Sequence, residues 1–245
     1  MRLVNTTSFR IEEFFGNDIP RYAILSHTWG RQEVSYHEWA IEELKSRDGY
    51  RKIIGACREA CKDDYDWIWV DTICIDKTSS VELSEAINSM YHWYYSSEIC
   101  YAYLSDVPNL SEWDLYTGYS QFNKSRWFSR GWTLQELLAP RQVKFYSKEW
   151  LYLSDKKSLA NEIQIITGIP SDIITSEEEP ATFSIAEKMS WAAKRNTTRI
   201  EDIAYCLLGI FDVNMPLLYG EGKRAFQRFQ DEIIRRSTDQ SFLIW

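Results

Sequence analysis

The stretch Tyr22-Ala-Ile-Leu-Ser-His-Thr-Trp-Gly30 joins a short apolar run to a polar turn. Its first five residues have the length of a buried β-strand, and a terminal glycine permits a close backbone approach. Three runs of the same kind follow along the chain, at Trp67-Ile-Trp-Val-Asp71, Ile99-Cys-Tyr-Ala-Tyr-Leu104 and Gln142-Val-Lys-Phe-Tyr146. Short apolar strands that alternate with helices are typical of a parallel sheet with helices on both faces. We therefore predict an open, doubly wound sheet, with its ligand crevice beyond the carboxyl ends of the strands.

The segments between and after these strands have helical patterns. Residues 35–64 predict two helices broken near Asp48-Gly49, Ser79 and Glu82 form a capping-box pattern, and 127–138 predict a helix that stops before Pro140. After residue 155 the strand pattern ends, and helices are expected over 156–166, 184–194, 199–210 and 223–236. We therefore expect residues 1–155 to form an α/β core and residues 156–245 to form a helical C-terminal lobe of the same domain.

Composition excludes several classes of protein. The 245 residues include 28 basic and 36 acidic side chains, and the net charge of −8 argues against a general nucleic-acid binder. No run approaches the length of a membrane span, and residues 1–16 lack a signal-peptide pattern, so we expect a cytoplasmic protein without membrane contact. An odd number of cysteines within apolar runs predicts reduced, buried thiols. The apolar end, Ser241–Trp245, suggests that the chain is cut from a longer protein.

The sequence predicts no metal site and no bound cofactor. His27, His37 and His92 lie far apart, outside the spacings that hold zinc. The glycine-rich stretch Gly220-Glu-Gly222-Lys223 lacks the spacing of a phosphate-binding loop, so a turn into the last helix is the better interpretation.

The stretch Ser129-Arg-Gly-Trp-Thr-Leu-Gln-Glu-Leu-Leu138 is a candidate for chemistry. On a helix, Trp132 and Glu136 are four residues apart and share one face. By composition alone, the indole would pack on the sheet and the carboxylate would be solvated. In the functional alternative, both lie at the crevice, where the indole stacks on a planar cation and the carboxylate stabilises a developing positive charge.

Further candidates follow the first two strands. Substrate-binding side chains are expected at the end of the first strand, and Asp71 closes the second. His27 is equally compatible with a structural role, and Asp71 with either ribose binding or capping of the next turn. The candidates at the end of the first strand are Ser26, His27, Thr28, Trp29 and Gly30.

Five long motifs resemble the fungal heterokaryon-incompatibility (HET) domain, in the order that this family has. They are 22–30, Trp69-Val-Asp-Thr-Ile-Cys-Ile-Asp-Lys77, Glu82–Met90, Arg130-Gly-Trp-Thr-Leu-Gln-Glu-Leu-Leu-Ala-Pro140 and Met215-Pro-Leu-Leu-Tyr-Gly-Glu-Gly222. Ile73 is a small departure, because many members carry cysteine there. The resemblance implies a role in programmed cell death after non-self recognition, often as the N-terminal effector of a receptor with a nucleotide-binding domain.

The order of strands and helices up to residue 146 is also similar to that of Toll/interleukin-receptor (TIR) domains. This resemblance implies a TIR-like (flavodoxin-like) open parallel sheet with flanking helices plus a C-terminal helical lobe. In enzymatic TIR domains the catalytic Glu follows a Trp by four positions, a spacing that Trp132 and Glu136 match. The resemblance to TIR domains therefore implies an NAD glycohydrolase in which NAD is the substrate, Glu136 is catalytic and Trp132 binds substrate.

Two functional hypotheses follow. In the first, the domain hydrolyses NAD when it self-associates into oligomers, and a long polar loop over residues 109–124 is either ordered by a neighbouring copy or is a surface insertion. In the second, the domain is a non-enzymatic adaptor that acts through homotypic assembly. The Trp132–Glu136 pair separates the two, since an adaptor does not need it.

Overall fold

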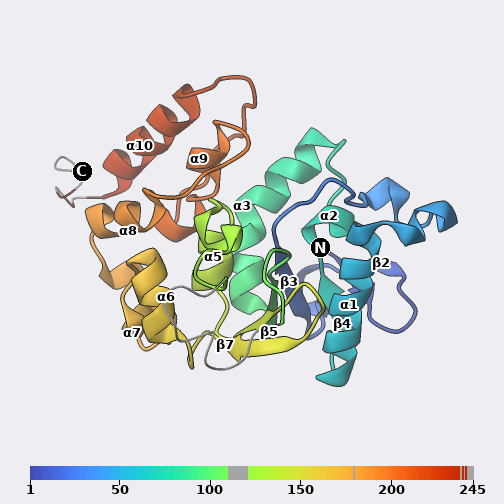
Figure 1. The fold of residues 1–245 in the computed structure, drawn as a ribbon. Helices are drawn as coiled ribbons and strands as arrows, with labels where there is room; N and C mark the ends of the chain where they lie inside the picture. Colours follow the sequence, from blue (N-terminus) through green and yellow to red (C-terminus); the bar gives the residue numbers. More distant parts are fainter. Residues whose placement is uncertain (110–120, 179, 238, 240, 242–245) are drawn as a thin grey trace.

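A seven-stranded sheet forms the centre of the molecule (Figure 1). The computed structural model describes residues 1–109, 121–178, 180–237, 239 and 241. The strands are β1 (Arg2–Asn5), β2 (Ile11–Glu13), β3 (Ala23–His27), β4 (Trp67–Trp69), β5 (Ile99–Tyr103), β6 (Val143–Tyr146) and β7 (Tyr152–Asp155).

The four central strands are parallel, and the strands at both edges are antiparallel. The order across the sheet is β2-β1-β4-β3-β5-β6-β7. Strand β3 pairs in parallel with β4 and with β5, and β6 pairs in parallel with β5. These are the four predicted strands, in the order second, first, third, fourth. The prediction of a parallel sheet is therefore right for its centre and wrong for its edges, where β1, β2 and β7 make the sheet mixed.

Helices cover both faces of this sheet. Figure 1 shows α1 on one side and α3 with α5 on the other. Within the described residues, none of the helices has the length and apolar character that crossing a bilayer requires. The helices are α1 (Asp48–Lys62), α2 (Asp71–Cys74), α3 (Ser80–Ser96), α5 (Thr133–Leu138), α6 (Ala160–Thr167), α7 (Ser171–Ile174), α8 (Ile185–Ala192), α9 (Asp202–Tyr205) and α10 (Arg224–Arg236).

Several helices differ from the prediction in their extent. Residues 35–47 contain two short 3₁₀ helices, Tyr36–Glu38 and Glu42–Ser46, and Asp48-Gly49 begins α1 instead of breaking a helix. The helix predicted over 127–138 is divided into a 3₁₀ turn, Arg126–Ser129, and the short helix α5. Most of the predicted polar loop, residues 110–120, lies outside the described residues.

The segment after β7 is helical, as predicted, and packs against α3. Helices α8, α9 and α10 fall within the expected ranges, and α6 ends one residue beyond its range. The Asn88 side chain on α3 makes two hydrogen bonds to the backbone of Met215. Its amide nitrogen donates to the Met215 carbonyl at 3.4 Å, and its oxygen accepts from the Met215 N–H at 3.3 Å. At Gly209 an added Cβ would lie 2.0 Å from the Cβ of Tyr91 on α3, so the two segments are in close contact.

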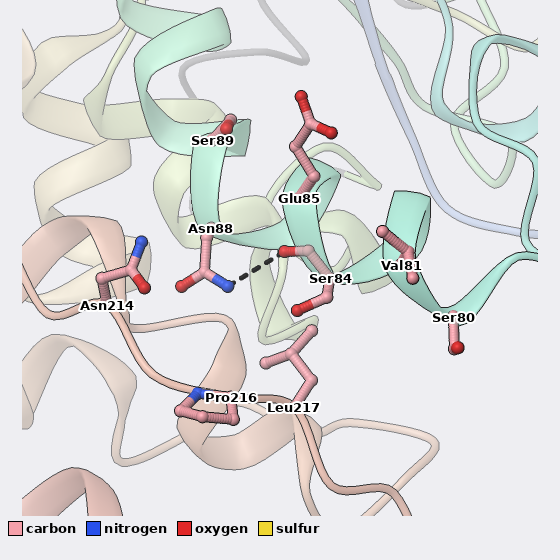
Figure 2. A pocket seen from close by; sticks show the side chains of 9 residues that line it. All are labelled: Ser80, Val81, Ser84, Glu85, Asn88, Ser89, Asn214, Pro216 and Leu217. Carbon is pink, nitrogen blue, oxygen red and sulfur yellow. Dashed lines mark hydrogen bonds between the residues drawn. The ribbon is translucent and has the colours of Figure 1, made fainter.

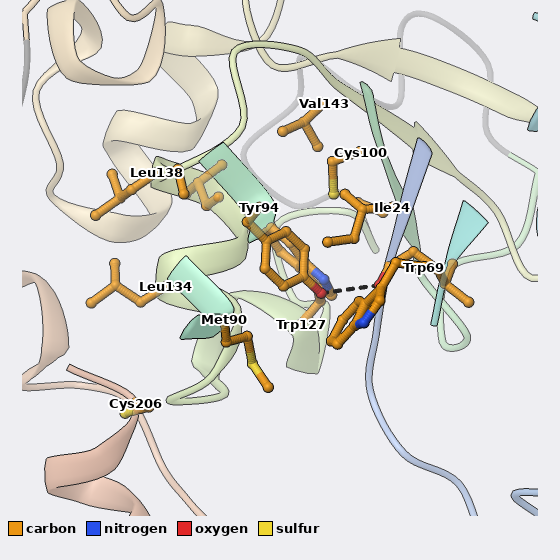
Figure 3. Close-up of a cluster of buried hydrophobic side chains, with 14 of the residues drawn as sticks. Ile24, Trp69, Met90, Tyr94, Cys100, Trp127, Leu134, Leu138, Val143 and Cys206 are labelled. Atoms are coloured by element: carbon orange, nitrogen blue, oxygen red, sulfur yellow. Dashed lines mark hydrogen bonds between the residues drawn. The ribbon is translucent and has the colours of Figure 1, made fainter. Parts of the chain in front are cut away.

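Large aromatic rings fill the space between α3, α5 and the sheet (Figure 3). Trp69, Tyr94 and Trp127 are completely or almost completely buried. Trp69 and Tyr94 make an edge-to-face contact, with ring centroids 5.9 Å apart, and the Tyr94 hydroxyl donates to the Leu25 carbonyl at 3.0 Å. Rings of this size contribute much of the apolar burial in a core. Two of them are also tied to the carboxyl half of β3, Tyr94 through Leu25 and Trp127 through Ser26.

The cysteines are mostly buried, as predicted. All five are free thiols, and four of them lie in the core. Cys61 is the exception, because it lies on the exposed face of α1.

Candidate functional site

The Glu136 carboxyl group is buried between α5 and β3. Glu136 is only 7% exposed to solvent. The Ser26 hydroxyl, on β3, donates a short hydrogen bond to the carboxyl group. The same hydroxyl accepts the indole N–H of Trp127 at 2.8 Å. Three side chains from three segments thus form one buried chain of hydrogen bonds from Trp127 through Ser26 to Glu136.

Burial raises the pKa of Glu136 to about 8. The hydrogen bond from Ser26 and the charge of Arg130 act in the opposite direction, and the negative charge of Asp71 raises the pKa further. Loss of hydration disfavours the charged form of a carboxyl group, and here this effect dominates. Glu136 is therefore protonated at neutral pH in the free protein.

The next residue of β3 belongs to a second polar cluster. Successive side chains of a strand point to opposite faces of the sheet, so His27 lies on the face opposite to Ser26. The centre of this second cluster is Asp71, the first residue of α2. One of its oxygens is 2.8 Å from His27 Nε2, and the other accepts from Trp29 Nε1 at 2.9 Å and from Lys77 Nζ at 3.3 Å.

Charge balance keeps Asp71 ionised. Burial opposes the ionisation of Asp71, but the positive charge of Lys77 and the hydrogen bond with His27 outweigh it and hold the pKa well below its usual range. Burial lowers the pKa of His27, and the nearby Lys52 lowers it further. Lys52 pairs in turn with Glu33 at 2.6 Å. The imidazole is therefore neutral, and its Nδ1 has no hydrogen-bond partner among the described residues.

The turn after β3 carries an exposed indole. Trp29 is 47% exposed, and the ammonium group of Lys77 lies 3.7 Å from the centroid of its ring. Its neighbour Gly30 donates its N–H to Glu33 at 2.6 Å, which fixes the turn. Thr28 is buried, with its hydroxyl 3.4 Å from that of Ser105, which follows β5.

These side chains meet where strand order reverses. From β3 the chain crosses to β4 on one side, and the next crossover returns past β3 to β5. In open α/β sheets this switch point is where ligands bind. Six of the eight predicted site residues, at 26–30 and Glu136, lie at or beside the carboxyl end of β3, and Asp71 joins them through His27 and Trp29.

Comparison with known proteins identifies the family that this chain resembles. The profile of the heterokaryon incompatibility protein (HET) family matches residues 22–113. The vegetative incompatibility protein HET-E-1 of Podospora anserina is 47% identical over 220 residues, which is 88% of this chain.

The chain carries a HET domain.

This HET domain spans 16% of the length of the Podospora protein, which is therefore a much longer chain. No solved structure matches.

One predicted partner of Glu136 lies elsewhere in the HET domain. Trp132 precedes α5 and is only partly buried, and its side chain lies beside Asp202. Burial raises the pKa of Asp202, against hydrogen bonds from Trp132 and from the Tyr219 hydroxyl at 3.0 Å. The indole that reaches the Ser26–Glu136 pair is that of Trp127, which the sequence did not single out. Helical spacing relates only residues of the same helix, and Trp127 belongs to the preceding 3₁₀ turn.

The backbone N–H groups of the glycine-rich turn are already hydrogen-bonded to a side chain of the HET domain. The backbone N–H groups of Gly220 and Gly222 donate to the Glu201 carboxylate at 2.9 and 3.0 Å, just before α10. This supports its interpretation as a turn into the last helix. In the described part of the chain, no group of three His, Cys, Asp or Glu side chains could hold a metal ion.

Proposed function

We propose that this HET domain is a cytoplasmic cell-death effector of fungal non-self recognition, and that it hydrolyses NAD to nicotinamide and ADP-ribose when it self-associates. The observation that carries the proposal is the buried Glu136 carboxyl group, held by Ser26 at the carboxyl edge of the parallel strands.

The proposed fold assignment is a TIR-like core over residues 1–155 with a helical lobe over 156–245. Its support is the central order β4-β3-β5-β6, in which all neighbours are parallel. This is the start of the flavodoxin-like order 2-1-3-4-5. Glu136 lies on the helix between the third and fourth of these strands, which is the position expected for a TIR-type catalytic glutamate.

A single carboxylate is sufficient for this reaction. Water adds to the anomeric carbon of the nicotinamide-linked ribose, the bond from this carbon to the pyridinium nitrogen breaks, and the electron pair leaves with nicotinamide. The water gives up one proton, which is released to the solvent. Because nicotinamide leaves as a neutral base, no general acid is needed, unlike the two-carboxylate hydrolysis of ordinary glycosides. The protein has to orient the dinucleotide and stabilise the ribosyl cation, which a preorganised carboxylate does.

The raised pKa of Glu136 suits a group that becomes active only with substrate. In the free domain Glu136 is neutral at pH 7. A pyridinium cation brought next to it would lower its pKa, because a nearby opposite charge favours the ionised form. The carboxylate would then appear only when the substrate is bound and the domain has opened around Glu136.

The proposed substrate contacts lie at the end of β3. Trp29 offers an exposed indole face, and Thr28 and Gly30 line the same turn. His27 and Asp71 hold this turn from beneath, since Asp71 accepts the Trp29 N–H. Trp132, at the start of α5 and beside Asp202, is a further proposed contact.

Self-association is the proposed trigger. An enzyme that consumes NAD in the cytoplasm would harm its own cell, so its resting state should be inactive. A competent state that forms only on docking of a second copy has a population that depends on concentration. Burial of Glu136 in the single chain supports this idea, as does the longer Podospora relative, in which further domains could control assembly.

A non-enzymatic adaptor is the alternative, and one observation favours it. An open cavity of about 540 Å³ lies between α3 and the segment 214–217 (Figure 2), and Glu136 does not line it. In Figure 2, Leu217 and Pro216 face Ser84 and Asn88 of α3 across this cavity. A surface groove of this kind suits a protein partner better than a dinucleotide.

The release of nicotinamide separates the two functions. Purified domain is incubated with NAD, free in solution and clustered on beads, and nicotinamide is followed by chromatography. The proposal expects release that increases with clustering. Absence of release under all clustering conditions, with assembly still detected by light scattering, would establish the adaptor instead.

A further inference from the structure

A short segment of the C-terminal lobe runs beside the turn that leads into α5. Asn196 and Arg130 form a parallel β-bridge. The Asn196 N–H donates to the Ser129 carbonyl at 2.7 Å, and the Asn196 carbonyl accepts the Gly131 N–H at 2.9 Å. An added Cβ at Gly131 would lie 2.5 Å from the Thr197 side chain, so the approach requires glycine.

The side chain of Arg195 extends this contact to the first residue of α5. Its Nη1 donates to the Arg130 carbonyl at 2.9 Å and to the Thr133 hydroxyl at 3.0 Å. The Thr133 hydroxyl also makes a short hydrogen bond to the Trp127 carbonyl. The guanidinium group thus contacts Arg130 and Thr133 directly, and Thr133 in turn closes the turn on the Trp127 carbonyl.

Arg195 holds a charge that no carboxylate in the described part of the chain pairs with directly. Among the described residues no carboxylate lies within salt-bridge distance of it. Its Nε donates to the Trp191 carbonyl at 3.3 Å, and its Nη2 has no hydrogen-bond partner within these same residues. Burial lowers the pKa of Arg195 to about 10, although Cys206 and Glu136, where they are ionised, raise it. The group remains a cation at neutral pH, and a buried cation without a carboxylate to balance its charge is unfavourable. A role beyond packing would account for its presence.

We propose that Arg195 is a positioning residue for Glu136, so that the C-terminal lobe forms part of the active unit. The inference rests on the proposed function of Glu136. Arg195 fixes the turn that carries Trp127 at one end and begins α5 at the other. Trp127 holds Ser26, Ser26 holds Glu136, and Glu136 lies three residues after Thr133 on α5. Both attachments of the carboxyl group therefore depend on this turn.

The guanidinium charge of Arg195 should affect a measurable quantity, the pKa of Glu136. The other groups that act electrostatically on Glu136 or are affected by it are Asp71, Tyr94, Cys100 and Arg130. Loss of the Arg195 cation removes a favourable interaction of the ionised carboxylate, and so the pKa of Glu136 should rise. This rise reports the charge alone, so positioning is tested with Arg195→Lys, which keeps the charge: a positioning role predicts a lower rate of NAD cleavage at an unchanged pKa of Glu136 and an unchanged Tm.

The experiment compares three variants with the wild-type domain. Arg195→Met removes the charge and the hydrogen bonds, whereas Arg195→Lys keeps the charge but cannot reproduce the forked donor geometry. Arg58→Met, at an exposed position of α1, is the matched control. The pKa of Glu136 is measured from the ¹³C carboxyl resonance in glutamate-labelled protein, assigned with Glu136→Gln. Thermal unfolding and nicotinamide release from NAD are measured in parallel.

We expect Arg195→Met to raise the pKa of Glu136, and Arg195→Lys to leave it near the wild-type value. Both should lower the rate of NAD cleavage roughly 10- to 100-fold, as for other displaced catalytic groups. Arg58→Met should change neither quantity. If Arg195→Met does not fold, the rate of folded Arg195→Lys is the test. A reduced rate supports the proposal, and a wild-type rate overturns it.

Folded Arg195 variants with wild-type titration and wild-type rate would overturn the inference and leave the proposed function intact. If the wild-type domain releases no nicotinamide, the proposed function fails. An unchanged pKa in Arg195→Met would then reject the placement of this charge beside Glu136 as well.

Discussion

Replacement of Glu136 by glutamine should make the HET domain more stable at neutral pH. In the unfolded chain the carboxyl group ionises near its ordinary pKa of 4.5, whereas burial raises the pKa of the folded state to about 8. Between these values the folded state binds more protons, so the free energy of unfolding falls as the pH rises. At about 1.4 kcal/mol for each pH unit, the wild-type domain loses about 3 kcal/mol between pH 4.5 and pH 7.

Glutamine keeps the shape of the side chain and can still accept the hydrogen bond from Ser26, but it does not ionise. Glu136→Gln should therefore match the wild type closely at pH 5 and exceed it by about 3 kcal/mol at pH 7, or roughly 6–12 °C in Tm for a chain of this size. The assay is thermal unfolding of both proteins from pH 5 to pH 8, with Glu43→Gln at an exposed position as the control. A difference in Tm between wild type and Glu136→Gln that does not change with pH would refute the reasoning.

Three further predictions concern neighbouring features. Trp127→Phe removes the N–H that holds Ser26 and should reduce NAD cleavage about 10-fold or more; an unchanged rate in folded protein would show that this hydrogen bond is dispensable. Trp132→Phe should lower the Tm and leave the KM for NAD unchanged if the indole only packs beside Asp202, whereas a raised KM at unchanged Tm would support the stacking role. Specific activity should increase with protein concentration and on clustering, and a flat dependence would indicate an active monomer.

The central strands could be predicted because each is a compact apolar run between clear turn residues. The edge strands were missed for the opposite reason. Strand β2, Ile11-Glu-Glu13, has one apolar residue, and β7 mixes exposed and buried positions. Such short strands are determined by the neighbour with which they pair, which local composition does not reveal. The antiparallel pairs β1–β2 and β6–β7 therefore appear only in the folded sheet.

The candidate site was predictable only in part. Glu136 and Ser26 were both singled out, but their contact joins positions 110 residues apart. Which of two nearby tryptophans reaches Ser26 depends on how the turn before α5 bends. The Arg130 carbonyl and the Thr133 hydroxyl of that turn accept hydrogen bonds from Arg195, a charged residue in the irregular segment after α8. Local patterns carry no information about such a contact.

The most direct test of the central claim is the rate of nicotinamide release from NAD by clustered wild-type domain and by clustered Glu136→Gln. A preorganised charged group typically contributes about 3–4 kcal/mol, so we predict a rate about 100- to 1000-fold lower in the variant. Thermal unfolding must show that Glu136→Gln is folded, and the stability argument above predicts that it is. Cleavage by folded Glu136→Gln at the wild-type rate would contradict the assignment of Glu136 as the catalytic group.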